Sequence, residues 1–254
     1  MSTLYEHTTD GAARGRIRLM QLYPHDMNIY GDWGNALVLA RRAQWQGYDV
    51  EMLSYDRGQE MEQDVHLIVG GGGQDSGQER IKEDLLSRGE ALRDMAEAGT
   101  PMLVICGLYQ LFGHHFVTTS GSELEGIGVL DAQTVAGSQR LIGNIALESE
   151  DFGTVVGYEN HSGLTRLGPG ASPFGRVRQG GGNNGEDGTE GARCHNVIGT
   201  YLHGSLLPKN PKVADWLLAR AVERAGGEWD PAPVDETIET WAERARAVAL
   251  SRPR

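Results

Sequence analysis

The chain has 254 residues, of which 39% are hydrophobic and 23% are charged, and its formal net charge is −12. This composition is typical of a globular protein with a sizeable core; no apolar run reaches the ~20 residues of a membrane span, and the negative charge argues against non-specific nucleic-acid binding. The only cysteines, Cys106 and Cys194, make no disulfide framework and favour a reducing, cytoplasmic setting.

Strand and helix patterns alternate through the first half of the chain. The polar segment 1–16 lacks a signal-peptide core and predicts a short disordered lead. Apolar strands are predicted at 17–22, 49–53, 66–69 and 102–105, with helical patterns after the first and third. The third strand runs into Gly70–Asp75, and Ser76 with Glu79 has the spacing of a capping box that opens the following helix. The alternation predicts an α/β fold with a mostly parallel sheet flanked by helices.

The second half is richer in short strands, predicted at 129–135, 140–147, 154–158, 174–178 and 196–201, which favour antiparallel additions to the sheet. The glycine-rich, acidic segment 179–192 predicts a flexible loop. A helix opened by Asn210-Pro211 follows, and a final amphipathic helix is predicted over 235–250 with the apolar stripe Ile238, Trp241, Ala245 and Val248. No linker forces two domains. We expect one domain over 17–227 and a C-terminal helical extension over 228–254.

Cys106 ends an apolar strand and is followed at once by Gly107 and a helical pattern. A thiol on such a corner, over a helix N-terminus, is well placed to be a nucleophile, whereas a lone buried cysteine is more often an inert core residue. Two other strand ends favour the nucleophile. His203 follows the last strand and is a candidate base, and Gly70–Gly73 offers backbone N–H groups for an oxyanion.

Several motifs carry a family resemblance. The pattern of Gly70–Asp75, C-G-L-Y-Q at 106–110, G-Y-E-N-H-S-G at 157–163 and Y-L-H-G at 201–204 resembles the class I, triad-type glutamine amidotransferases of flavodoxin-like fold, in their cobyric-acid-synthase-like branch. Longer motifs at 22–35, 140–144, 182–191 and 199–211 narrow the resemblance to the GatD family, the glutaminase subunits of lipid II isoglutaminyl synthases. It covers about 17–225.

The resemblance implies hydrolysis of L-glutamine to glutamate and ammonia through a cysteine thioester, with no cofactor in this chain. A MurT-like Mur ligase partner in a heterodimer would bind ATP and Mg²⁺ and use the ammonia to convert the D-glutamate of lipid II to D-isoglutamine, in the cytoplasm near the inner face of the membrane. By position the implied roles are nucleophile for Cys106, base for His203, oxyanion donor for Gly72 or Gly73 and Leu108, and binding of the glutamine α-carboxylate for Arg140.

Other residues have two interpretations. Gln110 reaches the substrate or caps its helix, and His161 lines the glutamine pocket or stabilises a turn. Arg140 without the resemblance is a solvated strand-end charge. The segment Asp26–Asp32 forms a loop near the site or an ordinary turn.

The third catalytic residue stays open in the sequence. Many triad glutaminases have a glutamate two residues after the histidine, and Ser205 stands there instead. The site is therefore a Cys–His dyad, or the partner supplies the orienting acid. Cys194 and His195 lack further ligands at zinc spacing, and the four glycines are not followed by the G-K-[ST] of a phosphate-binding loop.

Two rival functions remain at this point. One is a glutaminase for another carboxylate acceptor, such as a corrinoid precursor. The other is a non-catalytic or peptidase-like relative on the same fold.

Overall fold

The strands of the protein form two sheets. A computed structural model describes residues 1–203 and 205–251, and within these residues one sheet has seven strands and the other six. The strands of the main sheet are β1 (Ser2–His7), β2 (Arg16–Leu22), β3 (Asp49–Tyr55), β4 (Leu67–Gly70), β5 (Met102–Ile105), β12 (Ala192–Cys194) and β13 (Val197–Thr200). Their order across the sheet is β1–β3–β2–β4–β5–β13–β12.

The central strands of this sheet are parallel, in the order β3–β2–β4–β5–β13. Counted along the chain, this is the 2-1-3-4-5 order of flavodoxin-like folds, so the predicted fold class is confirmed. Gly70 pairs with Val104, and Thr200 pairs with Ile105. Because β4, β5 and β13 end at the same level, the segments that follow them meet at one edge of the sheet.

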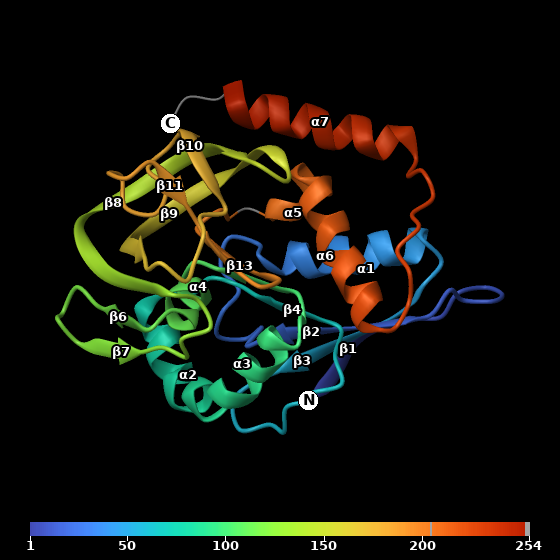
Figure 1. The fold of residues 1–254 in the computed structure, drawn as a ribbon, viewed down its shortest axis with the longest axis horizontal. Helices are drawn as coiled ribbons and strands as arrows, with labels where there is room; N and C mark the ends of the chain where they lie inside the picture. The colour runs from blue at the N-terminus through green and yellow to red at the C-terminus, as the bar shows by residue number, and fades with distance from the viewer. Residues whose placement is uncertain (204, 252–254) are drawn as a thin grey trace.

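The helices are α1 (Trp33–Trp45), α2 (Asp75–Ser87), α3 (Gly89–Glu97), α4 (Gly107–Phe112), α5 (Leu206–Lys209), α6 (Pro211–Arg224) and α7 (Glu236–Ser251). Helix α1 packs beside α6, and α2 and α3 lie across the strands from them (Figure 1). The helix predicted from Ser76 is in fact two helices that meet at Arg88. The first of them, α2, has Gln74 as its N-cap residue, and no side chain caps its N-terminus. The capping box predicted from Ser76 and Glu79 is therefore wrong.

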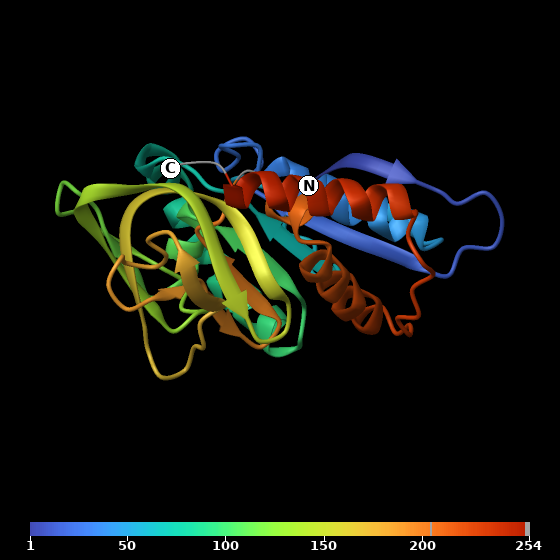
Figure 2. The same ribbon diagram turned by 90° about the horizontal axis from the view of Figure 1, so that it is seen from above.

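The second sheet is built on a long hairpin, at the end of the molecule opposite β1 (Figure 2). Its strands are β6 (His115–Val117), β7 (Glu123–Glu125), β8 (Ala132–Ser149), β9 (Gly153–Leu167), β10 (Gly175–Gln179) and β11 (Thr189–Glu190). The short strands predicted at 129–135 and 140–147 are one strand, β8. Its pairing with β9 is irregular, because residues 137–140 stand opposite the single residue Ser162. Such a bulge bends a strand and re-aims its side chains.

Two segments predicted to be disordered or flexible are ordered. Residues 2–7 form β1, which pairs antiparallel with β3, so the predicted disordered lead over 1–16 is wrong. Within 179–192, Asn183 and Glu190 are buried. Asn183 accepts a hydrogen bond from the Tyr109 hydroxyl at 3.0 Å, and Glu190 accepts one from the Tyr201 N–H at 2.7 Å. This segment is therefore part of the packed structure behind α4 and β13.

The final helix forms close to its predicted bounds, but its apolar stripe is not buried. Helix α7 has no buried residue, and Trp241 is 62% exposed. The helix lies along α5 and the β8–β9 hairpin (Figure 1). Among the described residues, no helix combines the length and apolarity needed to cross a membrane.

Candidate active site

Cys106 occupies the turn between β5 and α4. Its φ and ψ angles are 49° and −103°, and a positive φ is unfavourable for a residue with a side chain, so the surrounding structure must hold it. Gly107 permits this corner, because a Cβ there would lie 2.8 Å from Cε of Met27 and 3.1 Å from the Gly73 nitrogen. The strand–turn–helix corner predicted from the sequence is present, with the cysteine at its apex.

His203 reaches Cys106 from the end of β13. Its N–H donates to the Tyr158 carbonyl at 2.8 Å, and its side chain is fully buried. Gly72 shows how closely the groups converge: a Cβ on this residue would lie 2.5 Å from Cε1 of His203 and 3.2 Å from Cβ of Cys106. Only a glycine fits there. Residues that are 97 positions apart (203 − 106) therefore meet, as the parallel sheet predicted.

Asp32 is the third member of this cluster, and the sequence did not identify it. Nδ1 of His203 lies 3.2 Å from Oδ2 of Asp32, and Oδ2 also accepts the Gly72 N–H at 2.7 Å. Ser205, which stands where related sites have a glutamate, donates its hydroxyl to the Gly31 carbonyl at 2.7 Å. It thereby fastens the loop that carries Asp32. An acidic side chain of this chain therefore lies next to Nδ1 of His203, where the sequence offered only a dyad or an acid from the partner.

The electrostatics of His203 favour its charged form. Burial acts to lower the pKa of His203, but Cys106 and Asp32 outweigh this effect and raise it above its ordinary value. Nε2 has no hydrogen-bond partner among the described residues, although Cys106 is near enough to act on the pKa. Because Nδ1 faces Asp32, Nε2 is the nitrogen left for proton exchange with Cys106.

Of the predicted oxyanion donors, the structure excludes Gly72 and leaves Gly73 and Leu108 available. The Gly72 N–H is taken by Asp32, so Gly72 is wrong as a donor. Gly73 lines the cavity beside Cys106, and Leu108 lies in the first turn of α4, whose N–H groups have no partner within the helix. The Leu108 side chain packs on β4, since a Cβ at Gly70 would lie 2.3 Å from its Cδ1. Its N–H is therefore the part that can serve the site.

A cavity of about 560 Å³ adjoins Cys106, and both sheets contribute to its lining. The lining includes the three residues predicted to bind substrate, Gln110, Arg140 and His161. Gln110 is held at both ends: its Oε1 accepts from Gln78 at 2.8 Å, and its Nε2 donates to the Tyr201 hydroxyl at 3.2 Å. It has no role as a helix cap, because α4 has no side-chain cap bond.

Arg140 and His161 come from the β8–β9 hairpin and differ in burial. Arg140 projects from the bulge and is exposed. His161 is buried and stacks on Tyr201, with ring centroids 3.5 Å apart. Burial lowers the pKa of His161 to about 4, and the charges of His203 and Arg140 add to this effect. His161 is thus neutral near pH 7, with Nδ1 on the Gly163 carbonyl at 2.8 Å and Nε2 without a hydrogen-bond partner among the described residues.

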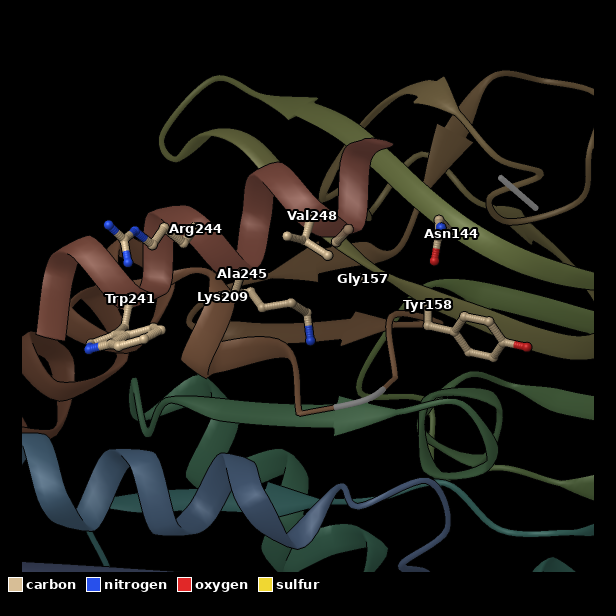
Figure 3. Close-up of a pocket in the computed structure, with 9 residues that line it drawn as sticks. Asn144, Gly157, Tyr158, Lys209, Trp241, Arg244, Ala245 and Val248 are labelled. Carbon is tan, nitrogen blue, oxygen red and sulfur yellow. The ribbon is translucent and has the colours of Figure 1, made fainter. Parts of the chain in front are cut away.

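A second cavity, of about 460 Å³, lies between α7 and the β8–β9 hairpin (Figure 3). Trp241, Arg244 and Val248 line it from the helix, and Lys209 and Tyr158 line it from below. Burial lowers the pKa of Lys209. The cavity shares no lining residue with the cavity at Cys106 and has no cysteine or histidine. Across residues 1–203 and 205–251, no three His, Cys, Asp or Glu side chains form a group that could hold a metal ion.

Known proteins resemble this chain over most of its length. Residues 18–211 match the CobB/CobQ-like glutamine amidotransferase domain. The GatD subunit of the glutamine-hydrolysing lipid II isoglutaminyl synthase of Staphylococcus aureus (strain N315) is 40% identical over 86% of this chain and 89% of the relative. The corresponding Streptococcus pneumoniae subunit (strain ATCC BAA-255 / R6) is 36% identical over 90% of this chain and 89% of the relative.

A solved glutamine amidotransferase from Thermotoga maritima has the same fold, with a TM-score of 0.52 and 18% identity over 92% of this chain and 93% of that one. The cluster at Cys106 lies within the matched domain, and the sequence relatives span nearly the whole chain. This chain therefore belongs to the CobB/CobQ-like glutamine amidotransferases and, among them, to the GatD family of lipid II isoglutaminyl synthase subunits.

Proposed function

We propose that this protein hydrolyses L-glutamine to L-glutamate and ammonia through a thioester on Cys106. The observation that carries the proposal is the meeting of Cys106, His203 and Asp32 around Gly72. A nucleophile, a base and an acid that orients the base are the parts needed for acyl transfer. The cavity beside Cys106 also contains Arg140, whose guanidinium suits the α-carboxylate of glutamine.

In the first half of the reaction, Nε2 of His203 holds the proton of the Cys106 thiol while the sulfur attacks the side-chain amide carbon. The N–H groups of Gly73 and Leu108 stabilise the oxyanion that forms. Nε2 then delivers the proton to the amide nitrogen. The C–N bond breaks, ammonia leaves, and the glutamyl group remains on sulfur as a thioester. The raised pKa of His203 favours the imidazolium that this step requires.

In the second half, His203 takes a proton from water, and the resulting hydroxide attacks the thioester carbonyl. The C–S bond breaks, the sulfur regains its proton and glutamate leaves. The sum is glutamine and water to glutamate and ammonia. Asp32 accepts a hydrogen bond from Nδ1–H throughout, which keeps Nε2 directed at the reacting atoms.

We infer that the ammonia is used to amidate lipid II. The named relatives are subunits of a glutamine-hydrolysing lipid II isoglutaminyl synthase, which supports this acceptor. A MurT-like Mur ligase partner, with ATP and Mg²⁺ bound to it, would activate the α-carboxyl of the D-glutamate residue, and ammonia would convert that residue to D-isoglutamine. The work would take place in the cytoplasm, where the lipid II head group is accessible.

Glutamate release from L-glutamine tests the hydrolytic step. Cys106→Ala and Cys106→Ser are each expected to lower kcat by at least about 10³-fold, because the thioester cannot form. Cys194→Ser is the matched control, since Cys194 lies on β12 and does not line the cavity. The electrophilic glutamine analogue diazo-oxonorleucine should label Cys106 and leave Cys194 unmodified. Retained hydrolysis in both Cys106 variants would refute the nucleophile.

Partner capture tests the acceptor. A Mur-like ligase is expected to co-purify with this protein, and the pair should incorporate the amide nitrogen of ¹⁵N-labelled glutamine into lipid II in the presence of ATP and Mg²⁺. Recovery of a corrinoid synthetase in its place, with transfer of the label to a corrinoid carboxylate, would replace lipid II as the acceptor and leave the glutaminase step intact.

A further inference from the structure

Asn160 joins two sides of the cavity. It lies on β9 opposite Ile142 of β8. Its Oδ1 accepts from Nε of Arg140 at 3.1 Å and from Nη2 at 2.8 Å, and its Nδ2 donates to the Tyr30 hydroxyl at 2.7 Å. An arginine can only donate hydrogen bonds, so its two contacts fix which end of the amide faces it. The other end then has to face Tyr30.

The contact leaves part of the Arg140 guanidinium for a carboxylate. Asn160 engages Nε and Nη2: its Oδ1 accepts from both, and its carbonyl also accepts from Nη2 at 3.2 Å. Nη1 has no hydrogen bond to a described residue, so its two N–H groups are the donors that remain for a carboxylate. Because Arg140 is exposed and projects from a bulge, Asn160 restricts a side chain that would otherwise sample many rotamers.

Tyr30, which accepts the hydrogen bond from Asn160, also contacts the catalytic histidine. Its ring packs edge-on against His203 with centroids 5.0 Å apart. Tyr30 is 47% exposed, and its φ of 56° is left-handed, so its own backbone does not favour this position. The hydrogen bond from Asn160 holds the hydroxyl end of the ring, on the opposite side of the cavity from the loop that carries it.

We propose that Asn160 is a positioning residue that sets the reach of Arg140 and so makes the site selective for amides that carry an α-carboxylate, while it fastens Tyr30 over His203. The inference rests on the proposed glutamine hydrolysis. Asn160 acts through Arg140 on substrate binding and through Tyr30 on the histidine. It does not touch the reacting atoms.

A double-mutant cycle for binding separates this role from a general effect on the hairpin. In a Cys106→Ala background, which does not consume the ligand, calorimetry gives the Kd of L-glutamine for four proteins: the background alone, and with Asn160→Ala, Arg140→Ala or both. Asn160→Ala is expected to raise the Kd about 10-fold, as two hydrogen bonds to Arg140 are lost. Added to Arg140→Ala, it should raise the Kd less than about twofold further.

The selectivity for the α-carboxylate is measured with 4-aminobutanamide, which keeps the amine and amide of glutamine and lacks the α-carboxylate. Its inhibition constant against glutamine hydrolysis is expected to change less than about twofold in Asn160→Ala. Ser138→Ala is the matched control, because Ser138 is an exposed residue of the same hairpin that does not line the cavity, and it should leave both ligands unaffected. Tyr30→Phe, which removes one hydroxyl, should lower kcat about fivefold with little change in KM.

Two results would overturn the proposal: additive losses from Asn160→Ala and Arg140→Ala, or equal weakening of glutamine and 4-aminobutanamide. A thermal melt of each variant shows that the protein is folded, and Asn160→Ser provides a second substitution if the alanine variant is not. Failure of the glutaminase itself is distinct from both, because it would appear as absent hydrolysis by the unsubstituted protein.

Discussion

The two sides of the cavity beside Cys106 differ in how far their functional residues are buried. The buried side is the cluster at the edge of the main sheet: Asp32 and His203 are 2% and 0% exposed, and Cys106, which lines the cavity, is 6% exposed. The open side is formed by β8 of the hairpin, where Arg140 is exposed and Ile142 is 50% exposed. Buried titratable groups influence each other's protonation strongly, and the proton transfers of the reaction depend on this coupling. Exposed groups bind a charged substrate less tightly, so the product can leave after each turnover. The comparison predicts that substitutions on the buried side act on kcat and those on the open side act on KM.

The largest effect is expected from Asp32→Asn on the buried side. The carboxylate that accepts a hydrogen bond from Nδ1–H of His203 is replaced by an amide that can favour the wrong tautomer, so kcat should fall about 10²- to 10⁴-fold while KM changes little. Steady-state glutamine hydrolysis measures both. Asp26→Asn is the control: it makes the same chemical change in the same loop, but Asp26 pairs with Arg80 at the surface.

The Asp32 variant also decides where the orienting acid comes from. The loss should persist when the ligase partner is present, since Asp32 already occupies Nδ1 of His203. If the partner restored kcat to the level of the unsubstituted complex, the acid would come from the partner, and the buried side would be incomplete without it.

The buried side was largely predictable from the sequence, and the reason is the regularity of parallel strands. Apolar runs that end in Gly70, Cys106 and the segment before His203 predict strand ends at one edge, and the register confirms it. Asp32 escaped prediction because its contact with His203 spans 171 positions. A sequence of turn-forming residues gives no sign of which one a distant histidine will meet.

The open side could not be placed by the same reasoning. Arg140 was identified only through a family motif, because its position depends on the bulge over 137–140, which no residue pattern indicates. The role of Asn160 likewise depends on the hairpin register. The glycines and charges of the segment 179–192 predict a flexible loop, yet Asn183 in this segment is buried and accepts a hydrogen bond from the Tyr109 hydroxyl on α4. Polar residues that satisfy buried partners look the same in sequence as polar residues in solvent.

On the open side, Arg140→Ala is expected to raise KM for glutamine about 10- to 100-fold with a smaller loss in kcat, because the grip on the α-carboxylate is lost but the thiol is untouched. The KM of Arg140→Lys should lie between those of the unsubstituted protein and Arg140→Ala, since lysine keeps the positive charge but lacks the paired N–H donors of the guanidinium. Arg166→Ala, an exposed arginine on the same strand pair that binds Glu186, controls for the general change in charge. A loss confined to kcat would place Arg140 with the catalytic groups and break the contrast.

The last expected effect concerns stability and arises behind the buried side. Burial raises the pKa of Glu190 to about 8, and the charge of Glu159 adds to this, although the Tyr201 N–H and the Thr200 hydroxyl act to lower it. Between its ordinary value near 4.5 and about 8, the folded protein keeps a proton that the unfolded chain releases. The free energy of unfolding should therefore fall as pH rises through this window, by at most about 1.4 kcal/mol per pH unit from this group, and level off above it.

Glu190→Gln removes that proton equilibrium while keeping a similar shape. Urea unfolding from pH 5 to 9 is expected to show a shallower decline in the variant than in the unsubstituted protein, with the variant gaining relative stability toward the alkaline end. Glu186→Gln, in the same segment but with its side chain 64% exposed, should leave the decline unchanged. Parallel pH profiles for the Glu190 variant and the unsubstituted protein would mean that Glu190 is ionised in the folded state. The buried side would then hold its charges by hydrogen bonding, with burial contributing little.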